Sequence, residues 1–248
     1  MNICLAQIKP TTGDIHANIG HHQAVIEQAA SLGADMLVFP ELSLTSFEPG
    51  LANELAMDIN DERLDIFQVL SNAHQLSIAL GLPLRQTEGI SISMLIFQPD
   101  QDRRMYSKGY LHSDEVPYFV PGKACSNLWG GQAKIAFAIC YELSVPAHVE
   151  QAIADGARMY VASVAKFVNG VEAASRRLSE LARRYEMPVL MCNCLGMADG
   201  GECAGQSAVW NREGELLGQL NESEEGMLLF DSTKRSVSIH YFSPANDT

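Results

Sequence analysis

The chain has 248 residues, which is enough to bury a full core, and no shift in its composition marks a second domain, so we expect one domain over residues 1–248. It carries 17 basic and 30 acidic residues and a formal net charge of −13. This excess of negative charge opposes broad contact with phosphate backbones and anionic lipid headgroups. It therefore argues against nucleic acid and membrane partners.

The amino terminus shows no secretory signal. The segment 1–10 has an apolar run too short for such a signal and no basic stretch before it, and no apolar stretch of the chain is long enough to span a bilayer. We therefore expect a cytoplasmic protein.

The metal-ligating and cofactor-binding motifs are missing as well. The six cysteines form no C-x-x-C pair and the seven histidines are scattered, so we expect neither a metal site nor a disulfide framework. There is no P-loop and no G-x-G-x-x-G, and the sequence predicts no cofactor. The cysteines are Cys4, Cys125, Cys140, Cys192, Cys194 and Cys203.

Strands and helices alternate along the first half of the chain. The pattern predicts strands at 2–9, 35–40, 77–83, 91–97 and 103–107 and helices at 17–32 and 61–76. The segment 98–102 is typical of a hairpin turn between the last two strands. An irregular segment with two prolines, between Gly109 and Gly122, is long enough to be a functional loop.

The second half continues this alternation. It predicts strands at 126–129, 133–140, 158–165, 188–194 and 226–231, helices at 146–155 and 171–186, and a hairpin over 207–217 that turns at Glu213-Gly214. Helices alternating with strands, with hairpins inserted, indicate an α/β fold with mixed sheets rather than a purely parallel one.

Three apolar runs end in residues that can do chemistry. Glu41 follows the run at 35–40, Lys108 follows the strand 103–107, and Cys140 ends the run at 133–140. Open α/β sheets build their sites at the carboxyl ends of strands, so a carboxylate, an ammonium and a thiol can meet there. This set can perform nucleophilic catalysis without a metal or cofactor.

Each of the three residues also has a plain structural interpretation. Cys140 can be the last core residue of a strand, Glu41 a turn or capping carboxylate, and Lys108 a solvated charge. Together, however, they suggest a nucleophile, a general base whose pKa is raised by desolvation, and a cation that lowers the thiol pKa and holds an oxyanion. The segment after Cys140 leads into a helix, so the Tyr141 amide is expected to face the oxyanion.

Three ordered segments resemble the signature motifs of the nitrilase superfamily, the carbon-nitrogen hydrolases. They are Phe39-Pro-Glu41, Tyr106-Ser-Lys108 and Ile139-Cys-Tyr-Glu142 with Pro146, and further similarity at 6–18, Asn193, 205–207 and 210–215 extends over nearly the whole chain. The resemblance implies a four-layer α-β-β-α sandwich with two mixed six-stranded sheets. It also implies pairing into a homodimer or higher homo-oligomer.

The resemblance further implies catalytic roles for Glu41, Lys108 and Cys140, and for a second glutamate in the loop before Tyr118-Phe-Val-Pro-Gly122. Glu115 occupies that place, with the adjacent Asp114 as the alternative if the loop register differs. The implied activity is hydrolysis of a small amide through a Cys140 thioester, with release of ammonia.

The substrate pocket departs from the pattern of many relatives. Where many amidases of the group have an Arg that holds a substrate carboxylate, this chain has Ser144, which weakens an ω-amidase assignment. Lys166 is a candidate substitute anchor. Phe167, Asn169, Asn193 and Met197 are expected on loops near the same sheet ends. Glu142 is expected beside the nucleophile, near the oxyanion or the substrate or as a helix-start acceptor, and His148 is expected to be structural.

Three alternatives to an amidase stay open at this point. An N-carbamoyl hydrolase would also release carbon dioxide, and a true nitrilase would form an acid from a nitrile. A third possibility, from a different class, is a catalytically silent relative kept as a binding or scaffold subunit. The partner expected in every enzymatic case is a small-molecule amide or carbamoyl compound.

Overall fold

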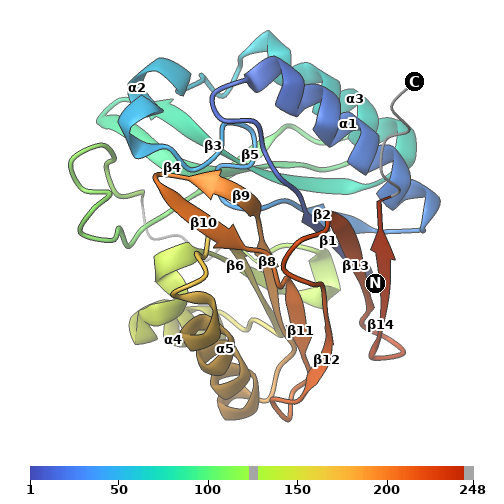
Figure 1. The fold of residues 1–248 in the computed structure, drawn as a ribbon. Coiled ribbons are helices and arrows are strands. Elements are labelled where there is room, and N and C mark those ends of the chain that lie inside the picture. Colours follow the sequence, from blue (N-terminus) through green and yellow to red (C-terminus); the bar gives the residue numbers. More distant parts are fainter. Residues whose placement is uncertain (123–127, 243–248) are drawn as a thin grey trace.

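The computed structural model describes residues 1–122 and 128–242, which form two β-sheets packed face to face with helices on their outer faces (Figure 1). The first sheet has seven strands in the order β14-β13-β1-β2-β3-β4-β5 and the second has five in the order β12-β11-β8-β7-β6. Both contain parallel and antiparallel pairs. The α/β class and the four-layer arrangement are confirmed, whereas the prediction of two six-stranded sheets is wrong.

The elements run as follows. The first sheet comprises β1 (Asn2–Gln7), β2 (Met36–Val38), β3 (Ser77–Gln86), β4 (Gly89–Phe97), β5 (Arg104–Ser107), β13 (Gly226–Asp231) and β14 (Ser236–Tyr241). The second comprises β6 (Ile135–Ile139), β7 (Met159–Val164), β8 (Val189–Asn193), β11 (Ala208–Trp210) and β12 (Leu216–Gln219), and β9 (Leu195–Ala198) pairs with β10 (Gly201–Ala204) as a separate hairpin.

The helices cover the outer faces of the two sheets (Figure 1). On the first sheet lie α1 (Ile15–Ser31) and α3 (Asp65–His74), and on the second α4 (Pro146–Ala154) and α5 (Val171–Tyr185). The short elements are α2 (Ala52–Leu55) and the single-turn 3₁₀ helices η1 (Pro49–Leu51), η2 (Glu62–Leu64), η3 (Gly131–Ala133) and η4 (Cys140–Ser144). None of the helices in the described part of the chain is both long and apolar enough to cross a membrane.

Strand alternation explains the layers. In β2, Met36 and Val38 face the second sheet and pack in the inter-sheet core, while Leu37 between them packs in the core under α1 and α3. A third core, between the second sheet and α4 and α5, includes Tyr160 and Leu178. Because β2 is buried on both faces, it appears in the sequence as a continuous apolar run.

The strands and helices expected from the sequence are confirmed wherever the structure describes them, with ends shifted by a few residues. The sequence pattern missed the strands β9, β10 and β14 and the one-turn helix α2. The hairpin strands are four residues long and contain glycine, and β14 is an exposed edge strand with Ser and His at alternate positions. The expected strand at 126–129 falls largely on residues 123–127, outside the described residues, and Trp129 forms an isolated bridge with Ile135.

Candidate active site

Glu41 and Lys108 meet at one edge of the first sheet. Glu41 follows β2, and Lys108 follows β5, which runs in the same direction as β2 because two antiparallel pairs separate β5 from β3. The carboxyl ends of both strands therefore lie at the same edge, as expected for a site in an α/β fold. The loop before Glu41 is tied to the second sheet, since the Ser163 hydroxyl of β7 donates to the Phe39 carbonyl oxygen at 2.8 Å.

Two glycines allow these two backbone segments to lie where they do. A Cβ at Gly81 would lie 2.4 Å from the Leu42 nitrogen, and a Cβ at Gly122 would lie 2.6 Å from the Ser107 carbonyl oxygen. No residue with a side chain fits at such distances. The Gly122 amide also donates to the Lys108 carbonyl oxygen at 2.7 Å, which closes the loop that begins at Gly109.

The Lys108 ammonium lies between two carboxylates. It is fully buried and donates to Glu41 Oε1 at 2.9 Å and to Glu115 Oε1 at 2.6 Å. The second oxygen of each carboxylate is also bonded, Glu41 Oε2 by the Ala165 amide at 3.2 Å and Glu115 Oε2 by the His112 amide at 2.8 Å. Backbone donors thus fix both carboxylates around one cation.

Glu115, and not Asp114, faces Lys108. The Asp114 side chain is 83% exposed and lies 3.3 Å from His112 Nδ1, at the rim of the site. The His112 ring packs edge-on against the Tyr141 ring with centroids 5.2 Å apart. The Glu115 loop therefore contacts the turn that carries Cys140.

Cys140 sits on a strained turn. It directly follows β6 and opens η4, with a backbone φ of +43°, a region that residues other than glycine adopt only under constraint. It lines a cavity of about 270 Å³ together with Phe47, Glu115, Tyr141, Ala165, Lys166 and Phe167. Cys140 thus lies at a small cavity, next to the Glu41–Lys108–Glu115 cluster.

The Cys140 thiol is not held as a thiolate in the free protein. Burial, and next the negative charge of Glu41, raise its pKa to about 11, although Lys166 and Lys108 act in the opposite direction. Lys108 lowers the thiol pKa, as the sequence-based expectation had it, but burial and Glu41 together outweigh the two lysines. A neutral thiol needs a base in contact before it can attack, and Glu41 is the carboxylate close to it.

The pKa values of Lys108 and Glu115 are shifted by burial and by the neighbouring charges of the same cluster. Burial alone would lower the pKa of Lys108, but the negative charges of Glu41, Cys140 and Glu115 outweigh it and raise that pKa above the ordinary lysine value. Burial, and next the charge of Glu41, raise the pKa of Glu115 against the opposing effect of Lys108. The cation is therefore permanent at neutral pH, and Glu115 is easier to protonate than an ordinary glutamate.

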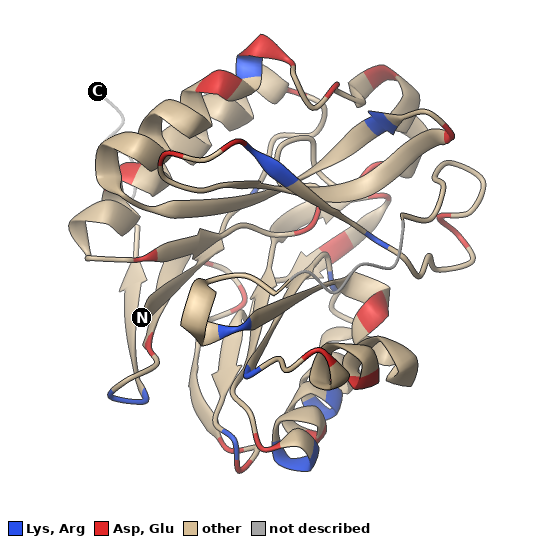
Figure 2. Ribbon diagram, turned by 180° about the vertical axis from the view of Figure 1, so that it is seen from behind, with Lys and Arg blue, Asp and Glu red and all other residues tan. Residues whose placement is uncertain are grey.

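Buried charge is concentrated at this one place. Over residues 1–122 and 128–242, the buried Asp, Glu, Lys and Arg residues are Glu41, Lys108, Glu115 and Glu142. The other charged residues lie mainly on helices and connecting segments (Figure 2). Because burying a charge is costly unless it is paired, the ion cluster of Glu41, Lys108 and Glu115, of which Glu115 lines the cavity, marks a functional site.

The sequence model of one family matches almost the whole described chain. The model for carbon-nitrogen hydrolases matches residues 2–238. The chain belongs to the carbon-nitrogen hydrolase family. It is therefore a hydrolase that acts on carbon-nitrogen bonds, in agreement with the resemblance of the three sequence motifs.

Individual relatives of this carbon-nitrogen hydrolase are distant. The 2-oxoglutaramate amidase of Bacillus subtilis is 25% identical over 91% of this chain and 87% of its own length. A glutamine-dependent NAD(+) synthetase of Thermotoga maritima is 23% identical over 90% of this chain, which spans 41% of that relative's length. An amidase of Nesterenkonia sp. AN1 has the same fold, with a TM-score of 0.85 and 22% identity over 93% of this chain and 92% of its own.

Among the predicted pocket residues, Lys166 and Phe167 line the cavity of the hydrolase. The Phe167 ring packs edge-on against Phe47 at 6.5 Å between centroids, which forms an aromatic wall. Asn169 lies on the same cavity, and Met197 is 60% exposed outside it.

Asn193 and Glu142, which were expected to contact substrate, are placed behind the cavity wall. Asn193 is buried, and its side chain bonds the Lys166 amide at 2.7 Å and the Lys166 carbonyl oxygen at 3.0 Å, so it holds the Lys166 backbone. Both oxygens of Glu142 are occupied by backbone amides and a tyrosine. Burial and these hydrogen bonds leave neither side chain among the lining of the cavity.

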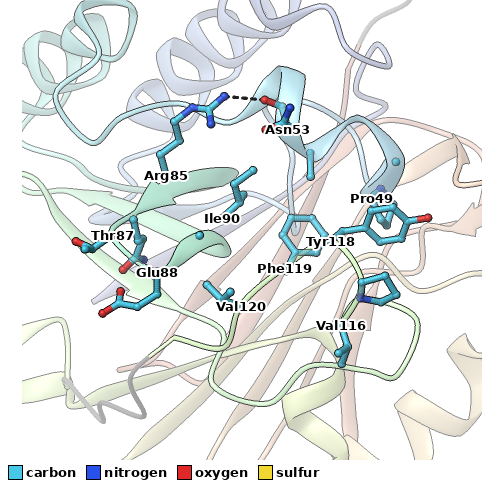
Figure 3. A pocket seen from close by; sticks show the side chains of 15 residues that line it. Pro49, Asn53, Arg85, Thr87, Glu88, Ile90, Val116, Tyr118, Phe119 and Val120 are labelled. Carbon is cyan, nitrogen blue, oxygen red and sulfur yellow. Dashed lines mark hydrogen bonds between the residues drawn. The ribbon is translucent and has the colours of Figure 1, made fainter.

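A second and larger cavity of about 610 Å³ lies on the other side of the Glu115 loop (Figure 3). Val116, Pro117, Tyr118, Phe119 and Val120 form one wall, and Arg85 at the opposite end donates to the Asn53 carbonyl oxygen at 2.7 Å. Among the described residues that line it there is no cysteine, lysine or histidine. The chemistry therefore points to the smaller cavity, although Pro49 borders both.

No group of three or more His, Cys, Asp or Glu side chains in the described part of the chain is arranged to hold a metal ion. The residues that sequence reasoning missed are Ala165, whose amide bonds Glu41, and Phe47 of the aromatic wall. Neither has a chemical signature, because an alanine amide acts through its backbone alone. Only the position of Ala165 at the carboxyl end of β7 hinted at it.

Proposed function

We propose that this hydrolase cleaves the carbon-nitrogen bond of a small amide through a thioester on Cys140. Glu41 accepts the thiol proton as Sγ attacks the carbonyl carbon, and the Lys108 ammonium and the Tyr141 amide stabilise the tetrahedral oxyanion. Glu41 then gives its proton to the leaving nitrogen, the carbon-nitrogen bond breaks, and ammonia departs. A thioester remains on Cys140.

The second half of the reaction uses the same groups. Glu41 removes a proton from a water molecule that attacks the thioester carbonyl, and Lys108 again stabilises the oxyanion. When the carbon-sulfur bond breaks, the sulfur recovers the proton from Glu41 and the carboxylic acid leaves. Glu115 keeps the Lys108 ammonium oriented throughout by accepting its hydrogen bond. It transfers no proton in either step.

One observation carries this proposal above the others. A fully buried ammonium bonds two carboxylates at 2.9 and 2.6 Å, at a cavity lined by a cysteine on a strained turn. A binding or scaffold subunit has no need for such a cluster, because buried ion pairs are at best a weak contribution to stability. The cluster instead supplies a base, an oxyanion partner and a nucleophile.

The cavity also suggests the class of amide. Its volume of about 270 Å³ admits only a small substrate, and Lys166 supplies a cation on its wall that lies near enough to Cys140 to lower its pKa. The substrates named for two relatives, 2-oxoglutaramate and glutamine, are both short amides that bear a carboxylate. We propose a short amide with a carboxylate held by Lys166, in place of the arginine that Ser144 replaces.

A matched panel of amides tests both parts of this proposal. We expect ammonia release from short amides, and a preference in kcat/KM for carboxylate-bearing amides over neutral amides of equal length. Lys166→Met should lower kcat/KM for carboxylate-bearing amides by at least about tenfold, because a hydrogen bond to a charged group contributes about 1.5–3 kcal/mol. The kcat/KM for neutral amides should stay nearly unchanged.

The panel also includes carbamoyl compounds and nitriles, with ammonia and carbon dioxide measured together. Carbon dioxide release from a carbamoyl compound alone would reassign the protein as an N-carbamoyl hydrolase, and acid from a nitrile alone would make it a nitrilase. A panel without any turnover would support the silent binding subunit. An unchanged preference in Lys166→Met would refute the carboxylate anchor only.

A further inference from the structure

Glu142 joins the two segments that carry Lys108 and Cys140. Its Oε1 accepts from the Gly109 amide at 2.7 Å, and its Oε2 accepts from the Ile139 amide at 2.8 Å. Gly109 directly follows Lys108, and Ile139 directly precedes Cys140. One buried carboxylate thus links the end of β5 in the first sheet to the end of β6 in the second.

The Glu142 carboxylate is itself held by a chain of side chains. The Tyr106 hydroxyl donates to Glu142 Oε2 at 2.6 Å and lies 2.7 Å from His148 Nε2, and His148 Nδ1 lies 2.8 Å from the Tyr160 hydroxyl. The four residues come from β5, η4, α4 and β7. The chain therefore ties two further elements, α4 and β7, to the link between the two sheets.

With a neutral His148, the protons of this chain have one arrangement. Since the single proton of Tyr106 goes to Glu142, His148 Nε2 must carry a proton and donate to the Tyr106 oxygen. His148 Nδ1 then accepts from the Tyr160 hydroxyl. Burial lowers the pKa of His148 and raises that of Tyr160, so both groups are neutral at neutral pH, as this arrangement requires.

We propose that Tyr106 and His148 are positioning residues, which act through Glu142 to hold the Cys140 turn and the Lys108 ammonium at a fixed separation. Neither side chain lines the cavity, and the polar atoms of both are engaged with Glu142, with each other and with Tyr160. Cys140 has a strained backbone with a φ of +43°, and such a conformation persists only where its surroundings over-determine it. The bond from Ile139 to Glu142, one residue before the strain, supplies part of that constraint.

The inference rests on the proposed function, which gives the Cys140 thiol and the Lys108 ammonium their catalytic roles. It can nevertheless be tested without any substrate. The substrate-free signal is the rate at which iodoacetamide alkylates Cys140, followed by peptide mapping against the buried thiols of Cys4, Cys192, Cys194 and Cys203. This rate depends on how well Glu41 and the Cys140 turn are aligned. The second signal is kcat and KM for the best amide of the panel.

Tyr106→Phe is the decisive variant, because it keeps the buried ring and removes only the hydroxyl. We expect about a tenfold fall in both kcat and the alkylation rate of Cys140, with KM within about twofold, since a hydrogen bond to a charged group is lost. Tyr110→Phe is the matched control: its ring packs edge-on against the same His148, with centroids 6.2 Å apart. It should leave both rates unchanged.

A pair of His148 variants separates positioning from mere packing. His148→Gln keeps one donor and one acceptor and should recover part of both rates relative to His148→Ala, at similar thermal stability. The proposal is overturned if Tyr106→Phe matches Tyr110→Phe in alkylation rate, or if all variants lose activity only in proportion to their melting temperatures. If amide turnover fails even in the unmodified protein, slower alkylation in Tyr106→Phe still supports the positioning role while the proposed function falls.

Discussion

Lys108→Met is expected to abolish turnover and to destabilise the fold. Methionine fills much of the lysine volume but leaves Glu41 and Glu115 facing each other in a buried site without a cation. Breaking a buried ion cluster by removing one partner costs about 3–5 kcal/mol in the free energy of unfolding. Separately from this effect on stability, loss of the oxyanion partner lowers kcat by a factor of about 10²–10³.

The stability loss should depend on pH in a defined direction. Lys108 lowers the pKa of Glu115, so its removal raises that pKa further above the unfolded value of about 4.3. A group with a raised pKa in the folded state binds its proton more tightly there, and the folded state gains stability as the pH falls. The variant should therefore recover part of its lost stability as the pH falls from 7.5 toward the unfolded value of about 4.3.

Urea unfolding over this pH range measures this recovery. Lys234→Met is the control, because Lys234 lies at the surface, with a side chain 79% exposed, and pairs with the surface residue Asp231 at 3.2 Å. Its stability difference from the unmodified protein should be small and nearly independent of pH. A Lys108→Met protein as stable at pH 7.5 as this control would contradict the proposed ion cluster.

Glu41→Gln should lower kcat by a factor of about 10²–10⁴, the usual contribution of a general base. The side chain keeps its size, but an amide cannot take the proton from the Cys140 thiol. The Ala165 amide also loses a carboxylate acceptor. Folding should be retained, since one carboxylate still pairs with Lys108 at 2.6 Å.

The same variant should lower the pKa of the Cys140 thiol, although it also loses turnover. The charge of Glu41 is the second cause that raises the pKa of Cys140 to about 11, so its removal should lower that pKa. The pH profile of iodoacetamide alkylation would then move to lower pH while turnover is lost. A variant that lost activity with an unchanged or higher midpoint would mean that Glu41 is not the neighbour of the thiol.

The strand ends were predictable from the sequence because they follow buried runs. Glu41, Lys108 and Cys140 each follow such a run, and the rule that α/β sites form at strand ends places them at one edge. The family resemblance then singled out Glu115 over Asp114. The structure shows Glu115 against Lys108 and Asp114 at the rim.

The pocket lining was less predictable, because it depends on which way side chains leave the loops. Asn193 and Glu142 are polar residues near the nucleophile in sequence, yet both point into backbone hydrogen bonds behind the wall. Nothing in a local pattern separates a carboxylate that serves a turn from one that serves a substrate.

The sign of the thiol shift was also beyond the sequence. Motif order predicts that Lys108 and Cys140 are near each other, but the pKa depends on the balance between burial, Glu41 and two lysines. The number of strands in each sheet was also missed, because short or polar edge strands such as β14 lack an apolar pattern. Assembly into a homodimer stays a prediction.

The most direct test of the whole account is to identify the residue that becomes acylated. The protein is mixed with the best amide of the panel, quenched during turnover and mapped by peptide mass, beside the Cys140→Ala variant. We predict an increase equal to the substrate acyl group on Cys140 alone, and no ammonia release by the variant. Steady turnover by Cys140→Ala, or an acyl group on any other residue, would contradict the account.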